Sequence, residues 1–484
     1  MKKWGEQVKN YKKLIYALVL VLIGFSIILS TNRRKELFRV AIEYNKDNLE
    51  TDLFKNDFIS SKLYEGLVRL GENGEVEAGV AESWNMNGNT WTFKLRKNVK
   101  LSNGNKIIAQ DFVEAISRNL RIQEKEENKL LLYNIKGAKD YEDGISEHIA
   151  GLRAIDNYTL EFELNEKISY FPKLLSNEKF FLNDEDGKIL NNGSFIVSNI
   201  DKEKINLEKS KTYWNKKNIK YDFIELINLK NQSEILERYE AKEINMIFLN
   251  NSNHNFFKEH RDFQIKSKKN FTYLAINNKS EILKNKNIRK AIAYGIDIEK
   301  IKRQLNLDIS SDRGFIPSNF QQERFIIKSN LEKAKKYLNL GLNELNKDIK
   351  EIGFITVFVP NTSIGYKYKK LLEETFLEIG LKIRVESPSL LIRRQKINQG
   401  NYDIYIDTSN ILYNSQIAYL ESWFSKSREA KLVNFSNSEY DEIILEIRND
   451  INKFQDFVKL GEELLMENMP VIPLFIEEEY FLSR

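Results

Sequence analysis

The sequence contains no cysteine, and it has only three histidines and six prolines among its 484 residues. Without cysteine the chain can form no disulfide, no thiolate metal site and no cysteine nucleophile. His148, His254 and His260 are too few for a histidine-rich metal site, and none of them shares the i, i+3 or i, i+4 spacing of ligands on one helix face. The scarcity of proline excludes Pro-rich linkers, so we expect domains that are joined by short ordered crossovers.

The sequence also lacks the common motifs of enzymes. It has no Gly-x-Ser-x-Gly elbow, no Gly-rich phosphate loop and no His-Glu-x-x-His pair. Its 75 basic and 70 acidic residues are interspersed, so the net charge is only +5 and no basic face is indicated for nucleic acid. We therefore predict a binding protein rather than an enzyme, with no catalytic residue, cofactor, metal or nucleic-acid partner.

A hydrophobic run near the N-terminus extends from Leu14 to Ser30 without a charge, and five lysines precede it. A helix over this run would be about 26 Å long, just short of the hydrocarbon core of a membrane. Such a run after a basic segment is typical of a secretory signal or of an uncleaved anchor. Because no small-x-small cleavage site stands out, we predict a membrane anchor, with the rest of the chain outside the cytoplasm.

The remaining chain is too long for one core, so two or three domains are expected. Between Leu63 and Arg118 the pattern predicts a compact α+β segment. Residues 91–95 alternate between apolar and polar side chains, as in a half-buried strand, and a helix with apolar residues at helical spacing begins at Ala109. Further on, strands near 354–359 and 381–386 flank a helix that ends at Gly380, which predicts a β-α-β unit and a parallel sheet.

Several of these segments, in their order and spacing, resemble the solute-binding proteins of bacterial peptide ABC transporters, which are family 5 of the extracellular solute-binding proteins. The residue blocks that carry the resemblance are Leu63–Val68, Gly79–Trp84, Trp91–Arg96, Leu101–Gly104, Ala109–Val113, Asn192–Phe195, Tyr213–Asn215, Glu243–Ile247, Phe271–Asn277, Asn287–Asp297 and Asn468–Phe475. They extend over most of the chain.

The resemblance implies a two-lobed α/β fold of the periplasmic-binding-protein type II kind with an additional α+β subdomain, preceded here by the transmembrane helix. It divides the chain into a cytoplasmic tail and anchor (1–35), a main lobe (36–60, 166–272 and 466–484), an inserted subdomain (61–165) and a second lobe (273–465). It also implies a monomeric receptor of the cell envelope that captures a peptide or peptide-like solute and delivers it to the permease subunits of an ABC transporter.

In this family the ligand lies between the lobes as an added strand, held by main-chain hydrogen bonds. The resemblance places the strands that pair with it at Thr51–Phe54, which includes Asp52 and Phe54, and at Thr408–Asn410, which includes Ser409. It also implies an aspartate that holds the free α-amino group of the ligand, directly before a tyrosine. When this sequence is aligned with the family motif without gaps, counting back from Tyr419, the tyrosine of the motif is present as Tyr413.

The aspartate, however, is replaced by Leu412, and the acidic-proline pair that follows in relatives is Ser415-Gln416. An arginine of some relatives corresponds to Ile406, and a tryptophan to Leu390. Asp407 lies five residues before Leu412, so on a regular strand it points to the opposite face, and it can substitute only if a bulge intervenes. A buried ammonium needs a carboxylate partner, so we expect a blocked, modified or partly apolar solute.

An alternative interpretation remains open. Typical relatives continue about thirty residues beyond the position of Arg484, an estimate from family length. Together with the missing aspartate, this favours a degenerate paralogue that acts as a membrane-tethered scaffold or sensory partner without transport.

Overall fold

The computed structural model describes residues 36–44, 56–71, 74–122, 129–183, 190–201, 203–250, 253–305, 313–317, 320, 325–413 and 415–484. The predicted anchor, Leu14–Ser30, and the predicted ligand-pairing strand, Thr51–Phe54, lie outside these residues. Within the described ranges, no helix is both long and apolar enough to span a bilayer.

One mixed sheet of ten strands runs through the molecule. In sheet order its strands are β14 (Ile383–Glu386), β13 (Ile355–Phe358), β15 (Ile404–Asn410), β12 (Phe263–Ile276), β16 (Val471–Ser483), β11 (Met246–Leu249), β1 (Leu37–Ile42), β10 (Phe223–Asn228), β9 (Lys204–Lys209) and β8 (Phe195–Ile200). Strand β13 is parallel to β14 and to β15, so the predicted β-α-β unit forms as expected.

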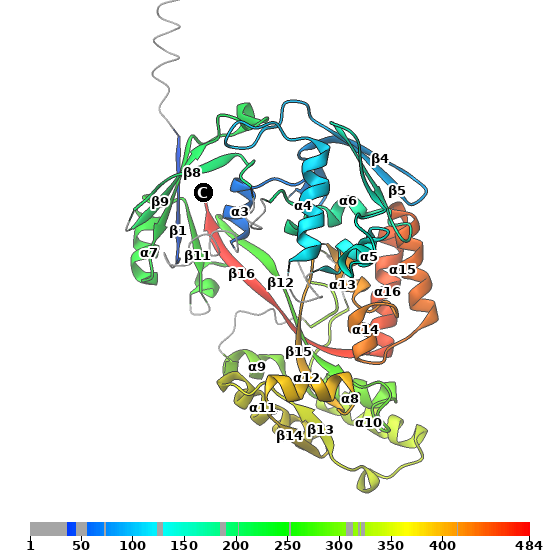
Figure 1. Ribbon diagram of the computed structural model, residues 1–484. Coiled ribbons are helices and arrows are strands. Elements are labelled where there is room, and N and C mark those ends of the chain that lie inside the picture. The colour runs from blue at the N-terminus through cyan, green and yellow to red at the C-terminus, as the bar shows by residue number, and fades with distance from the viewer. Residues whose placement is uncertain are drawn as a thin grey trace, which may run out of the picture.

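Two long strands, β12 and β16, connect the upper body of the molecule to the lower lobe (Figure 1). They are antiparallel neighbours, with Phe263 opposite Leu482 at one end and Ala275 opposite Val471 at the other. In the last part of β12, Phe271–Ile276, all six residues are buried, so both faces of the strand are covered, while its two edges pair with β16 and β15. These two strands therefore span the junction between the lobes.

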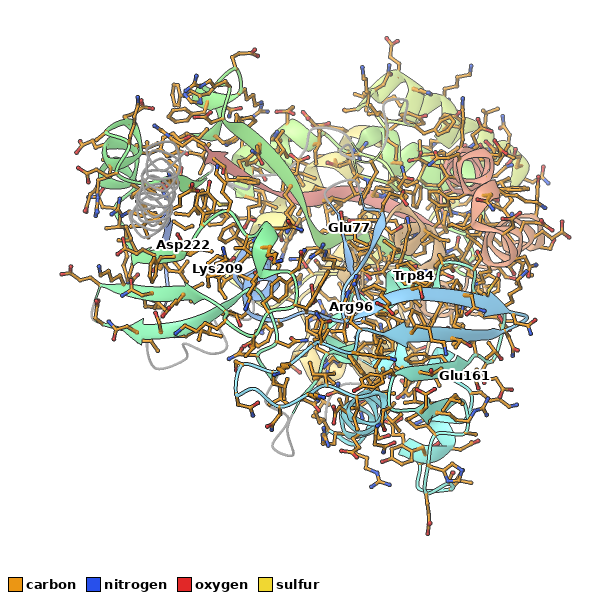
Figure 2. The ribbon with its side chains drawn as sticks, turned by 90° about the horizontal axis from the view of Figure 1, so that it is seen from above. Glu77, Trp84, Arg96, Glu161, Lys209 and Asp222 are labelled. Atoms are coloured by element: carbon orange, nitrogen blue, oxygen red, sulfur yellow. The ribbon has the colours of Figure 1, made fainter. Side chains whose placement is uncertain are left out.

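The upper body combines one end of the large sheet with smaller elements (Figure 1). A two-stranded sheet pairs β2 (Val68–Leu70) with β3 (Val76–Ala78). A four-stranded sheet has the order β4 (Ala81–Asn87), β5 (Thr90–Leu95), β7 (Thr159–Glu163) and β6 (Leu152–Asp156). The helices are α3 (Asp57–Leu63), α4 (Ala109–Arg121), α5 (Ala138–Glu142), α6 (Phe171–Leu174) and α7 (Gln232–Glu240). Seen from above, Lys209 and Asp222 lie near β9 and β10, away from Trp84 and Glu161 on the four-stranded sheet (Figure 2).

The predicted alternation in residues 91–95 is that of β5. Trp91, Phe93 and Leu95 are buried in one core with Phe112 and Ile116 of α4, which also follow the predicted helical spacing. The indole nitrogen of Trp91 donates a hydrogen bond to the carbonyl oxygen of residue 168 at 3.0 Å, so its one polar atom is satisfied inside the core.

Helices cover the lower lobe and the right side of the molecule in Figure 1. They are α8 (Lys286–Gly295), α9 (Ile298–Leu305), α10 (Leu331–Glu344), α11 (Ser363–Ile379), α12 (Leu390–Asn398), α13 (Gln416–Glu421), α14 (Arg428–Leu432), α15 (Ser438–Asn449) and α16 (Phe454–Asn468). Helix α11 ends at Gly380, whose φ of 92° is the left-handed conformation that glycine adopts at helix ends. The result is an α/β fold with two lobes, while the domain boundaries drawn from the sequence stay a prediction.

Candidate functional site

A cavity of about 850 Å³ lies where the lower lobe meets the upper body. Its wall includes residues of α12 and β15, the segment from Ile411 to Tyr413, the helices α13 and α14, and Leu130 and Leu174 of the upper body. Figure 1 places α12 and β15 at this junction. We call it the Asp407 cavity, because the carboxylate of Asp407 is on its wall.

Strand β15 presents alternate residues to this cavity. Tyr405, Asp407 and Ser409 are two residues apart, so a regular strand places them on one face, and all three line the cavity. Thr408 also lines it, although its hydroxyl forms a 2.9 Å hydrogen bond with that of Thr272 on β12.

The edge of β15 opposite β12 is only partly covered. Strand β12 pairs with β15 along its whole length, from Ile404 to Asn410. On the other side β13 pairs only with Ile404 and Tyr405. In the described ranges, no other strand pairs with this side of residues 406–410, so their main-chain donors and acceptors can pair with an added strand there.

Most of the predicted site residues gather around this cavity, and the others cannot be placed. The five on its wall are Asp407, Thr408, Ser409, Leu412 and Tyr413. Asn410 belongs to β15, but its side chain is outside the described part of the structure. Asp52 and Phe54 lie outside the described residues.

Leu412 is the residue at which the sequence predicts the loss of an amine-binding aspartate. Its side chain is partly buried and packs against the large core, and its carbonyl oxygen accepts a 2.6 Å hydrogen bond from the side-chain amide of Asn177. The neighbouring Tyr413 is only 4% exposed, and its hydroxyl donates to Glu421 at 3.1 Å. The hydroxyl of Tyr413 is therefore engaged inside the protein, and the wall beside it is apolar.

Asp407 is the carboxylate closest along the chain to this apolar wall. Burial raises its pKa, whereas the main-chain amide of Thr408 and the positive charges of Arg393 and Arg428 act in the opposite direction. The hydroxyl of Tyr273 is 3.5 Å from its Oδ2 atom. No ion pair within 4 Å joins Asp407 to a basic residue of the described chain. The carboxylate of Asp407 has thus lost part of its hydration, and the charges of Arg393 and Arg428 that act on it are positive.

A network of polar groups involves Tyr413, Glu421 and Arg448 of the cavity wall. Glu421 accepts hydrogen bonds from the hydroxyls of Tyr170 and Tyr413 and from Nε of Arg448, the last at 2.8 Å. Arg448 also contacts Glu166 at 3.0 Å. Since Tyr170 and Glu166 belong to the segment before α6, this network fixes the cavity wall to the upper body.

Sequence reasoning missed the residues that give this cavity its charge, namely Arg393, Arg428, Glu421 and Arg448, together with the tyrosine Tyr405. One signal was available. Arg393 and Arg394 stand three and four residues after Leu390, the position that the resemblance had already linked to the ligand. No comparable local pattern distinguishes the others.

The described ranges hold no group of three or more histidine, cysteine, aspartate or glutamate side chains that could bind a metal ion.

Comparison with known proteins gives consistent results. The family described as bacterial extracellular solute-binding proteins, family 5 middle, matches residues 75–431. The dipeptide-binding protein DppE of Bacillus subtilis is 26% identical over 460 residues, which cover 88% of this chain and 83% of that protein. The oligopeptide-binding protein OppA of the same organism is 24% identical over 504 residues, covering 96% and 92%.

Among solved structures, the periplasmic murein tripeptide-binding protein MppA in its unliganded open form has the same fold. Its TM-score is 0.72, with 19% identity and coverage of 93% of both chains. The two-lobed α/β architecture and the resemblance stated from the sequence are thus confirmed. Because the matching segment includes more than half of the sequence, this chain belongs to family 5 of the bacterial extracellular solute-binding proteins, whose members are binding receptors and not enzymes.

Proposed function

We propose that this protein captures a peptide or peptide-like solute between its two lobes, outside the cytoplasm. The observation that carries the proposal is the unpaired edge of residues 406–410 beside a cavity of about 850 Å³. An extended peptide can add to such an edge through main-chain hydrogen bonds, which do not depend on its sequence. The names of the relatives, a dipeptide-binding and an oligopeptide-binding protein, support the same class of solute.

The finer parts of the proposal follow from family membership and from the sequence. The fold is of the type II periplasmic-binding-protein kind, and the protein acts as a monomer that passes its solute to the permease subunits of an ABC transporter. The apolar run Leu14–Ser30 tethers it to the membrane.

We further propose that binding depends little on a free α-amine. Leu412 puts an apolar side chain where a carboxylate would hold an ammonium group, and an ammonium group loses hydration there without gaining a partner. Main-chain pairing along β15 is unaffected by this replacement.

The test is to incubate the full chain with a randomised pool of tri- to hexapeptides, half of each sequence N-acetylated, and to identify the retained species by mass spectrometry. We expect retained peptides in which acetylated and free forms are similarly represented. Retention of no peptide would overturn the proposed function and would favour the scaffold alternative. Retention of the free form alone would contradict the role assigned to Leu412.

A further inference from the structure

Two hydrogen-bond donors on the wall of the Asp407 cavity have no acceptor in the described part of the chain. They are Nε of Arg393 on α12 and the hydroxyl of Tyr405 on β15, and both atoms are buried. Such donors are rare in native proteins, because each has given up its hydrogen bonds to water without replacement. On the wall of a binding cavity, they indicate an acceptor that comes with the bound molecule.

The distribution of charge around the cavity indicates the sign of that molecule. Five basic and three acidic side chains line the cavity. The basic ones are Arg393, Arg394, Lys426, Arg428 and Arg448, and the acidic ones are Asp407, Glu421 and Glu429.

Among the described residues, three of these eight side chains form no ion pair, and they are Asp407, Arg393 and Arg394. Arg448 is paired with Glu421 and with Glu166, and Lys426 with Glu166. Arg393 and Arg394 form no ion pair with any described residue, and Arg394 is exposed whereas Arg393 is half-buried. Arg393 is therefore the guanidinium with the most to gain from an anion in the cavity.

Asp407 does not satisfy Arg393. Their mutual effect is long-range, since Arg393 lowers the pKa of Asp407 but no ion pair within 4 Å joins them. Tyr405 remains a donor at neutral pH, because burial and the nearby carboxyl of Asp407 raise the pKa of its hydroxyl well above the ordinary value. Arg393 acts on this hydroxyl as well, so the two unpaired donors lie within electrostatic range of each other.

We infer that the bound solute places a carboxylate in the Asp407 cavity, where it accepts hydrogen bonds from Arg393 and from the hydroxyl of Tyr405. This inference rests on the proposed function and makes it more specific, because it defines the solute as an anionic peptide or peptide-like molecule. The carboxylate is either the C-terminus of the solute or the side chain of an aspartate or glutamate. The free edge of β15, next to Tyr405, aligns the main chain of such a solute with the two donors.

The experiment uses the full chain and three pools of N-acetylated tetrapeptides built from neutral residues. The first pool has a free C-terminal carboxylate, the second has a C-terminal amide, and the third has the amide and a glutamate at its second position. Equilibrium dialysis with mass spectrometry gives the affinity for each pool. We expect the first or the third pool to bind about 10- to 100-fold more tightly than the second, as for a charge-assisted hydrogen bond, and the pool that binds more tightly identifies the source of the carboxylate.

Three substitutions locate the effect. Tyr405→Phe removes only the hydroxyl, which has no hydrogen-bond partner among the described residues, so the fold should be unaffected while the preference for the acid falls several-fold. Arg393→Gln should reduce that preference to less than about threefold, since a neutral amide replaces the charge-assisted donor, and Arg393→Lys should restore part of it. Lys396→Gln is the matched control, because Lys396 carries the same charge on the same helix but pairs with Glu386 and does not line the cavity.

The outcomes separate the two proposals. If wild type binds all three pools equally, or if Arg393→Gln leaves the acid preference unchanged, the inference about the carboxylate is wrong while peptide binding stands. If wild type binds none of the three pools and retains no peptide from the randomised pool, the proposed function itself is wrong.

Discussion

Replacing Glu421 by glutamine should destabilise the protein more than any surface charge substitution. Glu421 and Arg448 form a 2.8 Å ion pair in which the side chains keep 18% and 15% of their exposure. The substitution preserves shape but leaves Arg448 with only Glu166 as a charged partner. It also replaces an ionised acceptor of the Tyr170 and Tyr413 hydroxyls by a neutral one.

Breaking a fully buried ion pair costs about 3–5 kcal/mol, and a hydrogen bond to a charged group contributes about 1.5–3 kcal/mol. Because both side chains keep some contact with water and glutamine can still accept hydrogen bonds, we expect a loss of about 2–3 kcal/mol in the free energy of unfolding. The assay is urea unfolding followed by the fluorescence of the five tryptophans, among which Trp423 is 1% exposed and lies two residues after Glu421. The midpoint and the slope are compared together, since a chain with two lobes need not unfold in one step.

The matched control is Glu446→Gln, which removes a carboxylate whose pair with Lys453 is about half exposed and should change stability by about 0.2–1 kcal/mol. A double variant of Glu421 and Arg448 tests the coupling, and its loss should fall short of the sum of the single losses by about 1–3 kcal/mol. The network does not brace the cavity wall if Glu421→Gln lowers the free energy of unfolding no more than Glu446→Gln does. The same conclusion follows if the losses of the Glu421 and Arg448 single variants add up to the loss of the double variant.

Three further outcomes are expected. Leu412→Asp should raise the affinity for peptides with a free α-amine by about 1–3 kcal/mol and leave the affinity for the N-acetylated forms unchanged. Calorimetry with both forms measures this, and an equal change in the two affinities would contradict it. Burial alone would raise the pKa of Glu142, but hydrogen bonds from Lys129, Tyr133 and Lys139 lower it from 4.5 to about 2. This carboxylate therefore stabilises the fold above pH 4.5 and loses that contribution as the pH falls towards 2, so the unfolding midpoint of wild type should fall more steeply over this range than that of Glu142→Gln. Gly365→Ala should cost about 2–3 kcal/mol, because the new Cβ would lie 1.7 Å from the carbonyl oxygen of Pro360, while Gly353→Ala, with no atom within 4 Å, should be nearly neutral in thermal unfolding.

The elements that the sequence predicted well are those whose burial is decided locally. Trp91, Phe93 and Leu95 alternate because one face of β5 meets the core, and Gly380 ends α11 because glycine takes a positive φ at little cost. The position of β15 in the sheet carries no such signal. It lies between β12, which precedes it by more than a hundred residues, and β13, and only the paired structure reveals that β13 stops at Tyr405. The free edge beyond that point is a property of the register, which periodicity alone cannot give.

The residues of the candidate site also include some that the sequence could predict and some that it could not. A resemblance can transfer a residue only where this chain matches a position of the family. It therefore led to Leu412 and Tyr413, and Asp407 was named as a possible substitute for the carboxylate that is missing at Leu412. It could not lead to Arg393 or Tyr405, because what marks these two is the absence of an acceptor, a fact that depends on every neighbour in three dimensions. The replacement at Leu412 and the unpaired donors support the same interpretation. The predicted loss of the aspartate leaves the apolar Leu412 on the wall. Among the described residues the cavity also presents a guanidinium and a hydroxyl without an acceptor, so on our proposal it favours an anionic group in the solute over a cationic one.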